Sequence, residues 1–133
     1  MSRKKARQGL VSLIFKSQFN DNIEDHIINY YLDDFSYTPE ERVYILEGYD
    51  SIMKELDTID ETISKSLTSW TIDRLFKLDL SILRVAVYEM LFVENIPNEV
   101  SINEAVEIAK KYGSNESSKL INGILGAIIR REE

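Results

Sequence analysis

The sequence contains no cysteine, a single histidine and no long uninterrupted apolar run. Without cysteine there is no disulfide, no thiolate metal site and no thiol nucleophile. The lone His26 leaves little basis for zinc or triad chemistry, and we expect it at the surface. No apolar run reaches the roughly 18 residues that a membrane helix needs, and the basic start lacks the features of a secretion signal. We therefore expect a cytoplasmic protein that binds no cofactor or metal.

Proline and glycine are also scarce, with two and five residues among 133. Together with Leu and Ile at three- and four-residue spacing, this scarcity predicts an all-α protein. Three segments have the capping-box pattern that begins helices, namely 38–41, 58–61 and 101–104. Asp79 is expected to cap a helix starting at Leu80, and Gly113 to follow the end of another. About seven helices are predicted, over 3–19, 22–35, 39–56, 59–67, 71–77, 80–94, 102–112 and 115–131, with the pieces 59–67 and 71–77 merged or distorted.

The length fits one domain, residues 1–133, with helical subdomains at about 1–68 and 69–133 divided near Thr68-Ser69-Trp70-Thr71. Residues 80–93 form the most apolar predicted helix, which we place in the core. The last helix carries an apolar stripe that includes Ile121 and Leu125, and it also contains Gly123 and Gly126. Interior glycines cost a helix stability. They indicate a close approach to the backbone, either by a neighbouring helix or by a partner protein or RNA.

The protein is acidic, with 23 acidic against 16 basic residues and a net charge of −7, yet it begins with a basic cluster. Arg3, Lys4, Lys5 and Arg7 occupy four of five consecutive positions, and Arg3 and Arg7 are in helical register with Leu10 and Ile14. A core cannot accept unpaired guanidinium groups, so we expect this helix tip to project past the bundle or over a groove. Cations are unfavourable at a helix N-terminus, so the cluster fits a phosphate-binding feature. A solvated, frayed terminus remains the alternative, since charge runs usually have that role.

Three segments in the second half carry a family resemblance: Ile82-Leu83-Arg84-Val85-Ala86-Val87-Tyr88-Glu89, then Pro97 to Lys110, then Lys119-Leu120-Ile121-Asn122-Gly123-Ile124-Leu125. In this order and spacing they resemble the NusB family of bacterial transcription antitermination factors. The resemblance implies two small helical bundles packed at an angle, with the basic helix at an edge. It further implies binding of boxA RNA in ribosomal RNA transcripts together with the ribosomal protein NusE. Other Nus factors and RNA polymerase would be indirect partners.

The resemblance also suggests roles for individual residues. Arg3, Lys4, Lys5 and Arg7 match the basic motif and are the first RNA-contact candidates, and Lys119 and Asn122 could lie beside the RNA path.

Glu89 matches a glutamate that is associated with the NusE-facing surface, although it could be a simple exposed carboxylate, and Tyr88 is expected in the core. Three further positions stay open. Arg84 could form an ion pair or contact RNA, Phe15 could be core or RNA-facing, and Gly126 replaces an aspartate found in some members.

Other functional classes compete with this interpretation. An enzyme is disfavoured because no catalytic motif or phosphate loop is present. A helical protein–protein adaptor without RNA binding remains an alternative, and so does the NusB-like domain attached to some ribosomal RNA cytosine methyltransferases. The end of the chain at Glu133 favours the antitermination factor over the latter. A homodimer also remains open.

Overall fold

The computed structural model describes residues 1–20, 23–68 and 71–132. Within these ranges the chain forms seven α-helices and one short 3-10 helix, without strands, so the all-α prediction is confirmed. None of the helices described there is long and apolar enough to cross a membrane. The elements are α1 (Arg3–Ser17), α2 (Asp25–Asp33), α3 (Pro39–Lys54), α4 (Leu56–Ser64), η1 (Ile72–Arg74), α5 (Lys77–Phe92), α6 (Asn98–Tyr112) and α7 (Asn115–Glu132).

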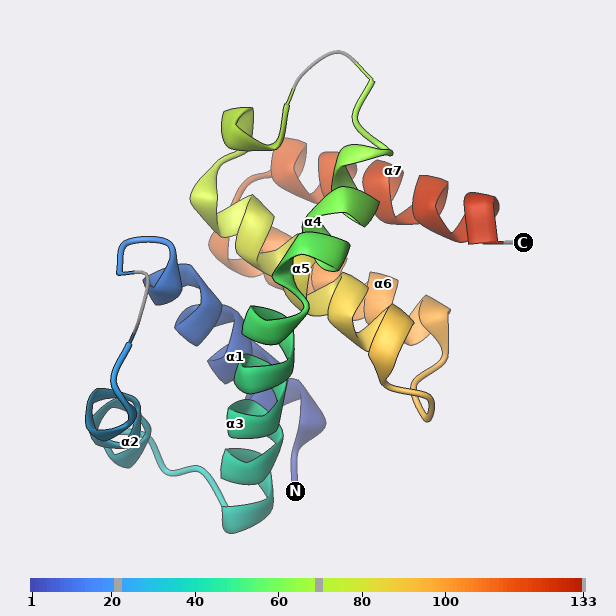
Figure 1. The fold of residues 1–133 in the computed structure, drawn as a ribbon. Helices are drawn as coiled ribbons and strands as arrows, with labels where there is room; N and C mark the ends of the chain where they lie inside the picture. Colours follow the sequence, from blue (N-terminus) through green and yellow to red (C-terminus); the bar gives the residue numbers. More distant parts are fainter. Residues whose placement is uncertain (21–22, 69–70, 133) are drawn as a thin grey trace.

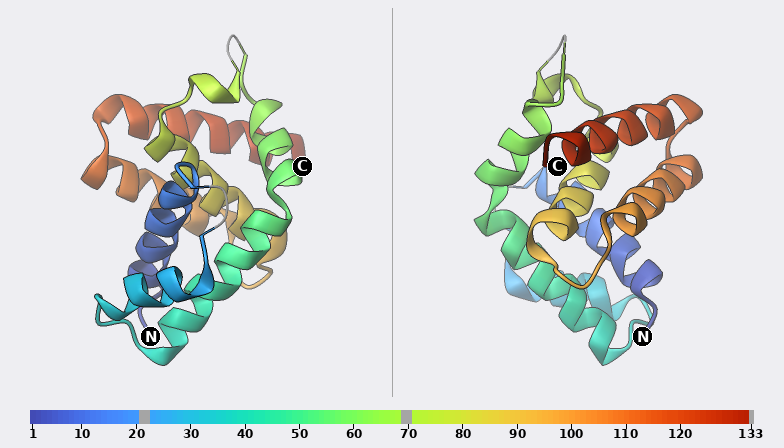
Figure 2. Two further views of the ribbon diagram at one scale, coloured as in Figure 1. Left: turned by 60° about the vertical axis from the view of Figure 1, so that its left-hand side comes forward. Right: turned by 90° about the vertical axis from the view of Figure 1, so that its right-hand side faces the viewer.

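Helix α5 lies at the centre of the molecule, and helices α1, α3, α4, α6 and α7 all pack against it. Figures 1 and 2 show two groups, with α1 to α3 at one end and α6 and α7 at the other, crossing at an angle. The N-terminus and α7 therefore lie at opposite ends. The subdomain boundary near residue 68 stays a prediction, and Ser69 and Trp70 of the expected divider lie outside the described residues.

The predicted central helix is indeed buried on most of its sides. A helix that is apolar nearly all round needs neighbours all round, and α5 has them. The exposed fraction is 7% or less for each of its core side chains, which are Leu80, Ile82, Leu83, Val85, Ala86, Val87 and Tyr88.

The predicted start of α3 is confirmed in detail. The Thr38 hydroxyl accepts a hydrogen bond from the Glu41 N–H (3.2 Å), and the Glu41 carboxylate accepts one from the Thr38 N–H (2.8 Å). Pro39 occupies the first helical position, where its missing N–H is not needed. The second oxygen of Glu41 accepts a hydrogen bond from the Ser2 N–H at 2.7 Å. This carboxylate therefore ties the start of α3 to the start of α1.

The starts of α1 at Arg3 and of α7 at Asn115 are as predicted. The helix starts predicted from Thr58, Asp79 and Ser101 are wrong, because each of these capping candidates lies inside its helix. Helix α4 begins at Leu56 rather than after Thr58, directly following α3. Helix α6 begins at Asn98, and Ser101 is buried in its first turns with its hydroxyl bonded to another helix. Helix α5 begins at Lys77, and the buried Asp79 carboxylate accepts a hydrogen bond from Ser117 of α7 at 3.2 Å. The side chains of Ser101 and Asp79 thus hydrogen-bond to residues on other helices instead of capping their own.

Between α4 and α5, only Ile72–Arg74 is helical within the described residues, so the 71–77 helix is reduced to one 3-10 turn. The end of α6 is as predicted, with Gly113 following Tyr112 as the C-cap.

Helix α7 packs its predicted apolar stripe against the rest of the protein, since Ile121, Ile124, Leu125 and Ile128 are all buried. Its two glycines do not behave as the neighbouring-helix interpretation required. A Cβ placed at Gly123 would meet no atom within 4 Å, and one at Gly126 would meet only the Arg130 side chain at 3.4 Å. Within residues 1–20, 23–68 and 71–132, no neighbouring helix approaches the backbone at these glycines, so that interpretation is wrong.

The double role of Glu41 makes folding stability depend on pH. The backbone N–H groups of Thr38 and Ser2 hold the pKa of the Glu41 carboxyl below its usual value. A carboxylate with a lowered folded-state pKa stabilises the fold above its unfolded pKa, and this contribution is lost as the pH falls through the folded pKa. We expect Glu41→Gln to lower the melting temperature at about pH 7, with a difference that shrinks towards about pH 3.

Thermal unfolding followed by circular dichroism, on both proteins across this pH range, measures the difference. The exposed neighbour provides a control, because Glu40→Gln should produce no comparable change. A difference for Glu41→Gln that persisted unchanged in acid would show that the carboxylate charge is not what stabilises the junction.

Candidate nucleic-acid interface

Three cations stand exposed on the first turn of α1: Arg3, Lys4 and Lys5. The Lys5 ammonium donates a hydrogen bond to the Ser36 carbonyl at 2.6 Å, and the Arg3 guanidinium lies 5.5 Å from the centre of the Tyr44 ring. Lys4 is 60% exposed and lies 3.6 Å from Glu104. Exposed pairs at such distances contribute little. These three residues, which we call the basic tip, therefore present positive charge to solvent at one end of the molecule.

Arg7, the fourth member of the predicted cluster, is in a different environment. Its side chain is only 4% exposed, and its Nε donates to the Glu89 carboxylate at 2.7 Å. Its Nη1 donates to Glu104 at 3.2 Å. The expectation that Arg7 projects with the other three is wrong, because the register that aligns it with Leu10 and Ile14 carries it into the protein. Paired carboxylates make that burial acceptable.

Glu89 is likewise buried rather than exposed on a partner-facing surface. It is fully shielded from solvent, and one oxygen accepts from both Arg7 and the Tyr44 hydroxyl. The other oxygen accepts from the Ser101 hydroxyl at 2.9 Å. The structure therefore contradicts both sequence-based interpretations of Glu89, as a NusE-facing group and as an exposed carboxylate. All the carboxylate's contacts in the described residues are internal.

Residues from four helices meet in this cluster, which we call the Arg7–Glu89 network. Tyr44 comes from α3 and was not singled out from the sequence, and Ser101 comes from α6 and was predicted only as a helix cap. Burial, together with the charge of Glu89, raises the pKa of the Tyr44 hydroxyl, so the phenol stays neutral and donates. One sequence signal could have revealed the pairing. Arg7 and Glu89 are each the charged residue on an otherwise apolar helix face, and their charges are opposite.

Arg84, for which two roles were open, forms a two-pronged ion pair with Asp60 of α4. Its Nε and Nη2 donate to the two carboxylate oxygens at 2.9 and 2.8 Å. The Arg84 side chain is only 12% exposed. This geometry favours the structural role, because the guanidinium edge that would meet a phosphate is occupied.

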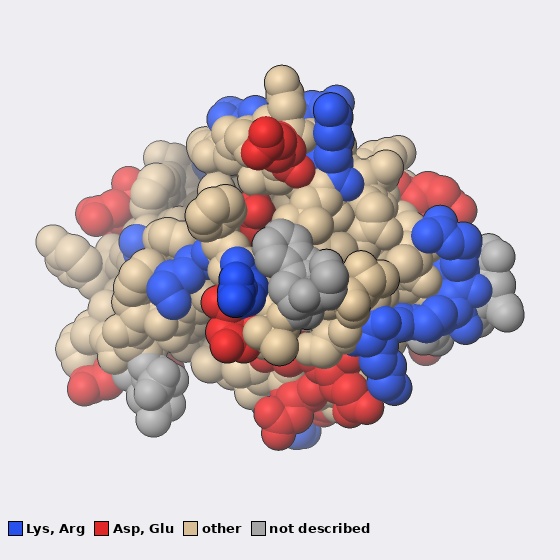
Figure 3. Space-filling model, turned by 90° about the horizontal axis from the view of Figure 1, so that it is seen from above, with Lys and Arg blue, Asp and Glu red and all other residues tan. Residues whose placement is uncertain are grey.

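Lys119 and Asn122 are exposed on α7, but the structure does not bring them to the basic tip. Helices α5 and α6 lie between α1 and α7 (Figures 1 and 2). Figure 3 views the α7 end of the molecule, where Lys and Arg form separate groups with Asp and Glu among them. A ligand that touched both Lys119 and the tip would have to run along the molecule.

Among the described residues no cluster of three potential metal ligands occurs. His26 is 75% exposed and lies 3.3 Å from Glu24, at the surface as expected. Phe15 is half-buried, and its ring contacts Phe19 edge-on.

Comparisons with known proteins agree with the geometry. The sequence model of the NusB family matches residues 1–130. Transcription antitermination protein NusB of Clostridium botulinum is 42% identical over 134 residues, covering 98% of this chain and 100% of that protein. The protein of the same name from Agathobacter rectalis is 42% identical over 127 residues, covering 94% and 97% of the two chains.

Solved structures show the same fold. A crystal form of T. maritima NusB superposes with a TM-score of 0.89 at 36% identity, covering 98% of this chain and 92% of that one. A complex described as antitermination factors NusB and NusE with dsRNA has a TM-score of 0.87 at 23% identity, covering 97% and 96%. Because the sequence identity is only 23%, the second comparison shows a shared fold and nothing more.

The buried network generates a stability prediction. Arg7→Ala would leave the Glu89 carboxylate buried without its cation, and breaking such a pair destabilises by about 3–5 kcal/mol. We expect this loss in the free energy of unfolding, measured by urea denaturation.

Arg3→Ala is the matched control, since it removes the same side chain one turn earlier, from an exposed site. The contact with the Tyr44 ring is lost there, and we expect this loss to cost at most about 1 kcal/mol. Equal losses for the two variants would contradict the structural role of Arg7.

Proposed function

Because the chain belongs to the NusB family, we propose that it is a transcription antitermination factor that binds boxA RNA of ribosomal RNA transcripts together with NusE. In this role it joins other Nus factors on RNA polymerase in the cytoplasm and supports processive transcription. It acts by binding rather than by catalysing a reaction. The observation that carries the RNA-binding part is the exposed basic tip on an otherwise acidic protein.

Electrostatics support the basic tip as the RNA-binding site. The protein carries a net charge of −7, which repels polyanions in general. Arg3, Lys4 and Lys5 form a local exception on one helical turn, where they can neutralise several phosphates of one strand. The helix N-terminus adds a further partial positive charge. RNA binding is therefore favoured at the basic tip and disfavoured over the acidic remainder of the surface.

The one buried member of the predicted basic cluster, Arg7, serves this site indirectly. Arg7 fixes the rotation of α1 through Glu89, and that rotation directs Lys4 and Lys5 outward. Lys119 and Asn122 are proposed as a second contact, at the far end of a strand that extends along the molecule. Glu89 is not part of the proposed NusE-binding surface, because its carboxylate is buried.

The first prediction concerns the tip. Replacing Arg3, Lys4 and Lys5 together by alanine should weaken binding of boxA RNA. It should also reduce the slope of log affinity against log salt by about 2, at roughly 0.7 per lost phosphate contact with a single strand. The melting temperature should stay nearly unchanged because all three side chains are exposed. Fluorescence anisotropy at several salt concentrations provides the measurement.

A charge-matched control removes three exposed cations elsewhere, namely Lys54, Lys65 and Arg74. Titrating boxA RNA against a scrambled RNA, with and without NusE, completes the design. If the tip variant kept its affinity and salt slope, the tip would not be the RNA site. If wild-type protein bound neither RNA in either condition, the helical-adaptor alternative would replace the proposal.

A further inference from the structure

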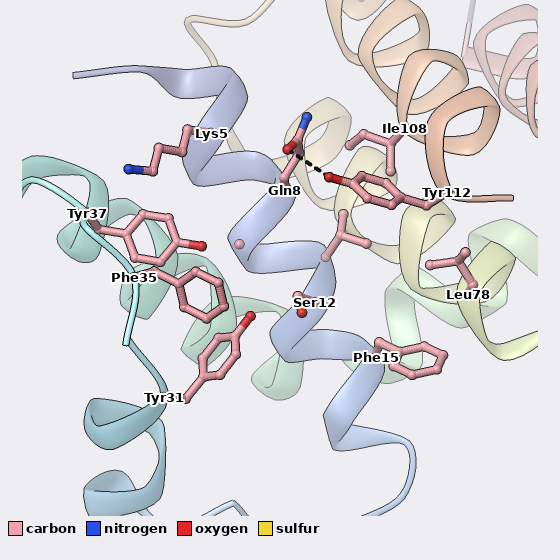
Figure 4. A pocket seen from close by; sticks show the side chains of 12 residues that line it. Lys5, Gln8, Ser12, Phe15, Tyr31, Phe35, Tyr37, Leu78, Ile108 and Tyr112 are labelled. Carbon is pink, nitrogen blue, oxygen red and sulfur yellow. Dashed lines mark hydrogen bonds between the residues drawn. The ribbon is translucent and has the colours of Figure 1, made fainter. Parts of the chain in front are cut away.

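Two hollows adjoin α1, and their linings differ in charge. The larger, a groove of about 400 Å³, lies between aromatic side chains of α2 and the segment after it and Tyr112 of α6 (Figure 4). None of the described residues that line this groove is acidic. The smaller hollow, of about 130 Å³, lies between α1 and α6 and shares Gln8 and Ile108 with the groove. Its other lining residues are all charged, namely Lys4, Arg7, Glu104, Glu107 and Lys111.

Glu104 of α6 bridges two cations of α1 in the smaller hollow. One carboxylate oxygen, Oε1, accepts a hydrogen bond from Arg7 Nη1 at 3.2 Å, and the other, Oε2, lies 3.6 Å from Lys4 Nζ. The Glu104 side chain is 19% exposed, whereas that of Lys4 is 60% exposed. Because the buried Arg7 holds one of its oxygens, the Glu104 carboxylate stays beside Lys4 and is not free to swing into solvent.

The charges in this cluster assign the charge of Glu104 to Lys4. Arg7 already forms an ion pair with the buried Glu89 at 2.7 Å, and that pair is neutral as a whole. Glu104 is therefore a second carboxylate on a single guanidinium group. Its negative charge is left to be balanced by Lys4, which faces its other oxygen.

The direct contacts of the two other cations of the basic tip are with neutral groups. Arg3 lies against the Tyr44 ring, and the Lys5 ammonium donates to the Ser36 carbonyl. Neither contact offsets a positive charge. Lys4 differs, because a phosphate that approaches it also meets a fixed carboxylate. The Lys4–Glu104 pair adds little to the stability of the fold, but like charges a few Å apart near a protein surface repel more strongly than in bulk water.

We propose that Glu104 is an internal counterion of Lys4, which competes with RNA phosphate and lowers the affinity of the basic tip for RNA in general. The inference rests on the proposed function and adds to it a residue that restrains the RNA site. Phosphates are the same in every RNA, so this restraint carries no sequence preference. An RNA must therefore make further contacts, with the protein or with NusE, to bind tightly.

The sign of the effect separates this role from a purely structural one. Glu104→Gln keeps a side-chain oxygen that can accept from Arg7, and Glu89 still holds the guanidinium group, so α1 stays in place. If Glu104 only supported the fold, its replacement would leave RNA affinity unchanged or lower it. A counterion predicts the opposite result, a gain in affinity.

Glu104→Gln should raise the affinity for a boxA oligonucleotide by about three- to tenfold, the scale of one charge interaction at a surface. The slope of log affinity against log salt should steepen by up to about 0.7, because Lys4 becomes free for one more phosphate contact. A scrambled RNA should gain by the same factor. Fluorescence anisotropy at several salt concentrations measures these effects, and circular dichroism checks that the melting temperature is retained.

Two controls locate the effect. Glu107→Gln removes the same charge about one turn further along α6, from an exposed residue that lines the same hollow. Within the part of the chain that the structure describes, Glu107 forms no ion pair with Lys4, so its replacement should raise the affinity less. A double-mutant cycle tests the coupling, because in a Lys4→Ala background Glu104→Gln should bring little or no gain.

Each outcome decides a different question. If the tip variant bound RNA weakly but Glu104→Gln bound no better than wild type, the counterion inference would be wrong and the proposed function would stand. Equal gains from Glu104→Gln and Glu107→Gln, or a gain that persisted in full without Lys4, would assign the effect to net charge and would also overturn the inference. If the tip variant bound RNA as tightly as wild type, the proposed RNA site would fail together with its counterion.

Discussion

The ion pair between Arg7 and Glu89 is the interaction on which the arrangement of this protein depends. Both side chains are almost completely removed from water, and each would be strongly unfavourable there without the other. Tyr44, Ser101 and Glu104 complete their hydrogen bonds, so that α1, α3, α5 and α6 converge on one polar point inside an apolar core. Only one guanidinium nitrogen, Nη2, lacks a partner among the described residues.

A buried pair of this kind specifies an arrangement more than it adds stability. Apolar side chains tolerate small rotations of a helix, whereas two hydrogen-bonded charges do not. Once Arg7 is held, the rotation of α1 about its axis is set. Leu10 and Ile14 then face the core. Lys5, Gln8 and the residues in line with them face the groove beside α1 instead.

The surface properties follow from this rotation. Helix α1 has an exposed basic first turn and a face that lines an aromatic-flanked groove, and neither includes an acidic residue of its own. The abundant carboxylates lie elsewhere or are used internally, as Glu41 and Glu89 are. An acidic protein can bind a polyanion when its negative charge is kept away from one limited strip. Membership in the NusB family gives that strip a biological context.

Much of the fold was accessible from the sequence, because the relevant signals are local. Helical periodicity identified the class and the central place of α5. Thr38 and Gly113 marked a start and an end because capping involves residues within one turn. The same local rule misplaced Ser101 and Asp79, whose side chains are taken by partners on other helices. The exposure of Arg3, Lys4 and Lys5 was likewise foreseen from charge alone.

The fate of Arg7 and Glu89 was decided by tertiary structure alone. They lie 82 positions apart, and although each interrupts an apolar helix face, neither position by itself shows that the other lies beside it. Whether such a charge is exposed or buried depends on whether an opposite charge arrives beside it, which no local pattern records. The groove has the same origin: Tyr31, Phe35 and Tyr112 are ordinary aromatic residues in sequence, and only the packing of α2 and α6 around α1 turns them towards one another.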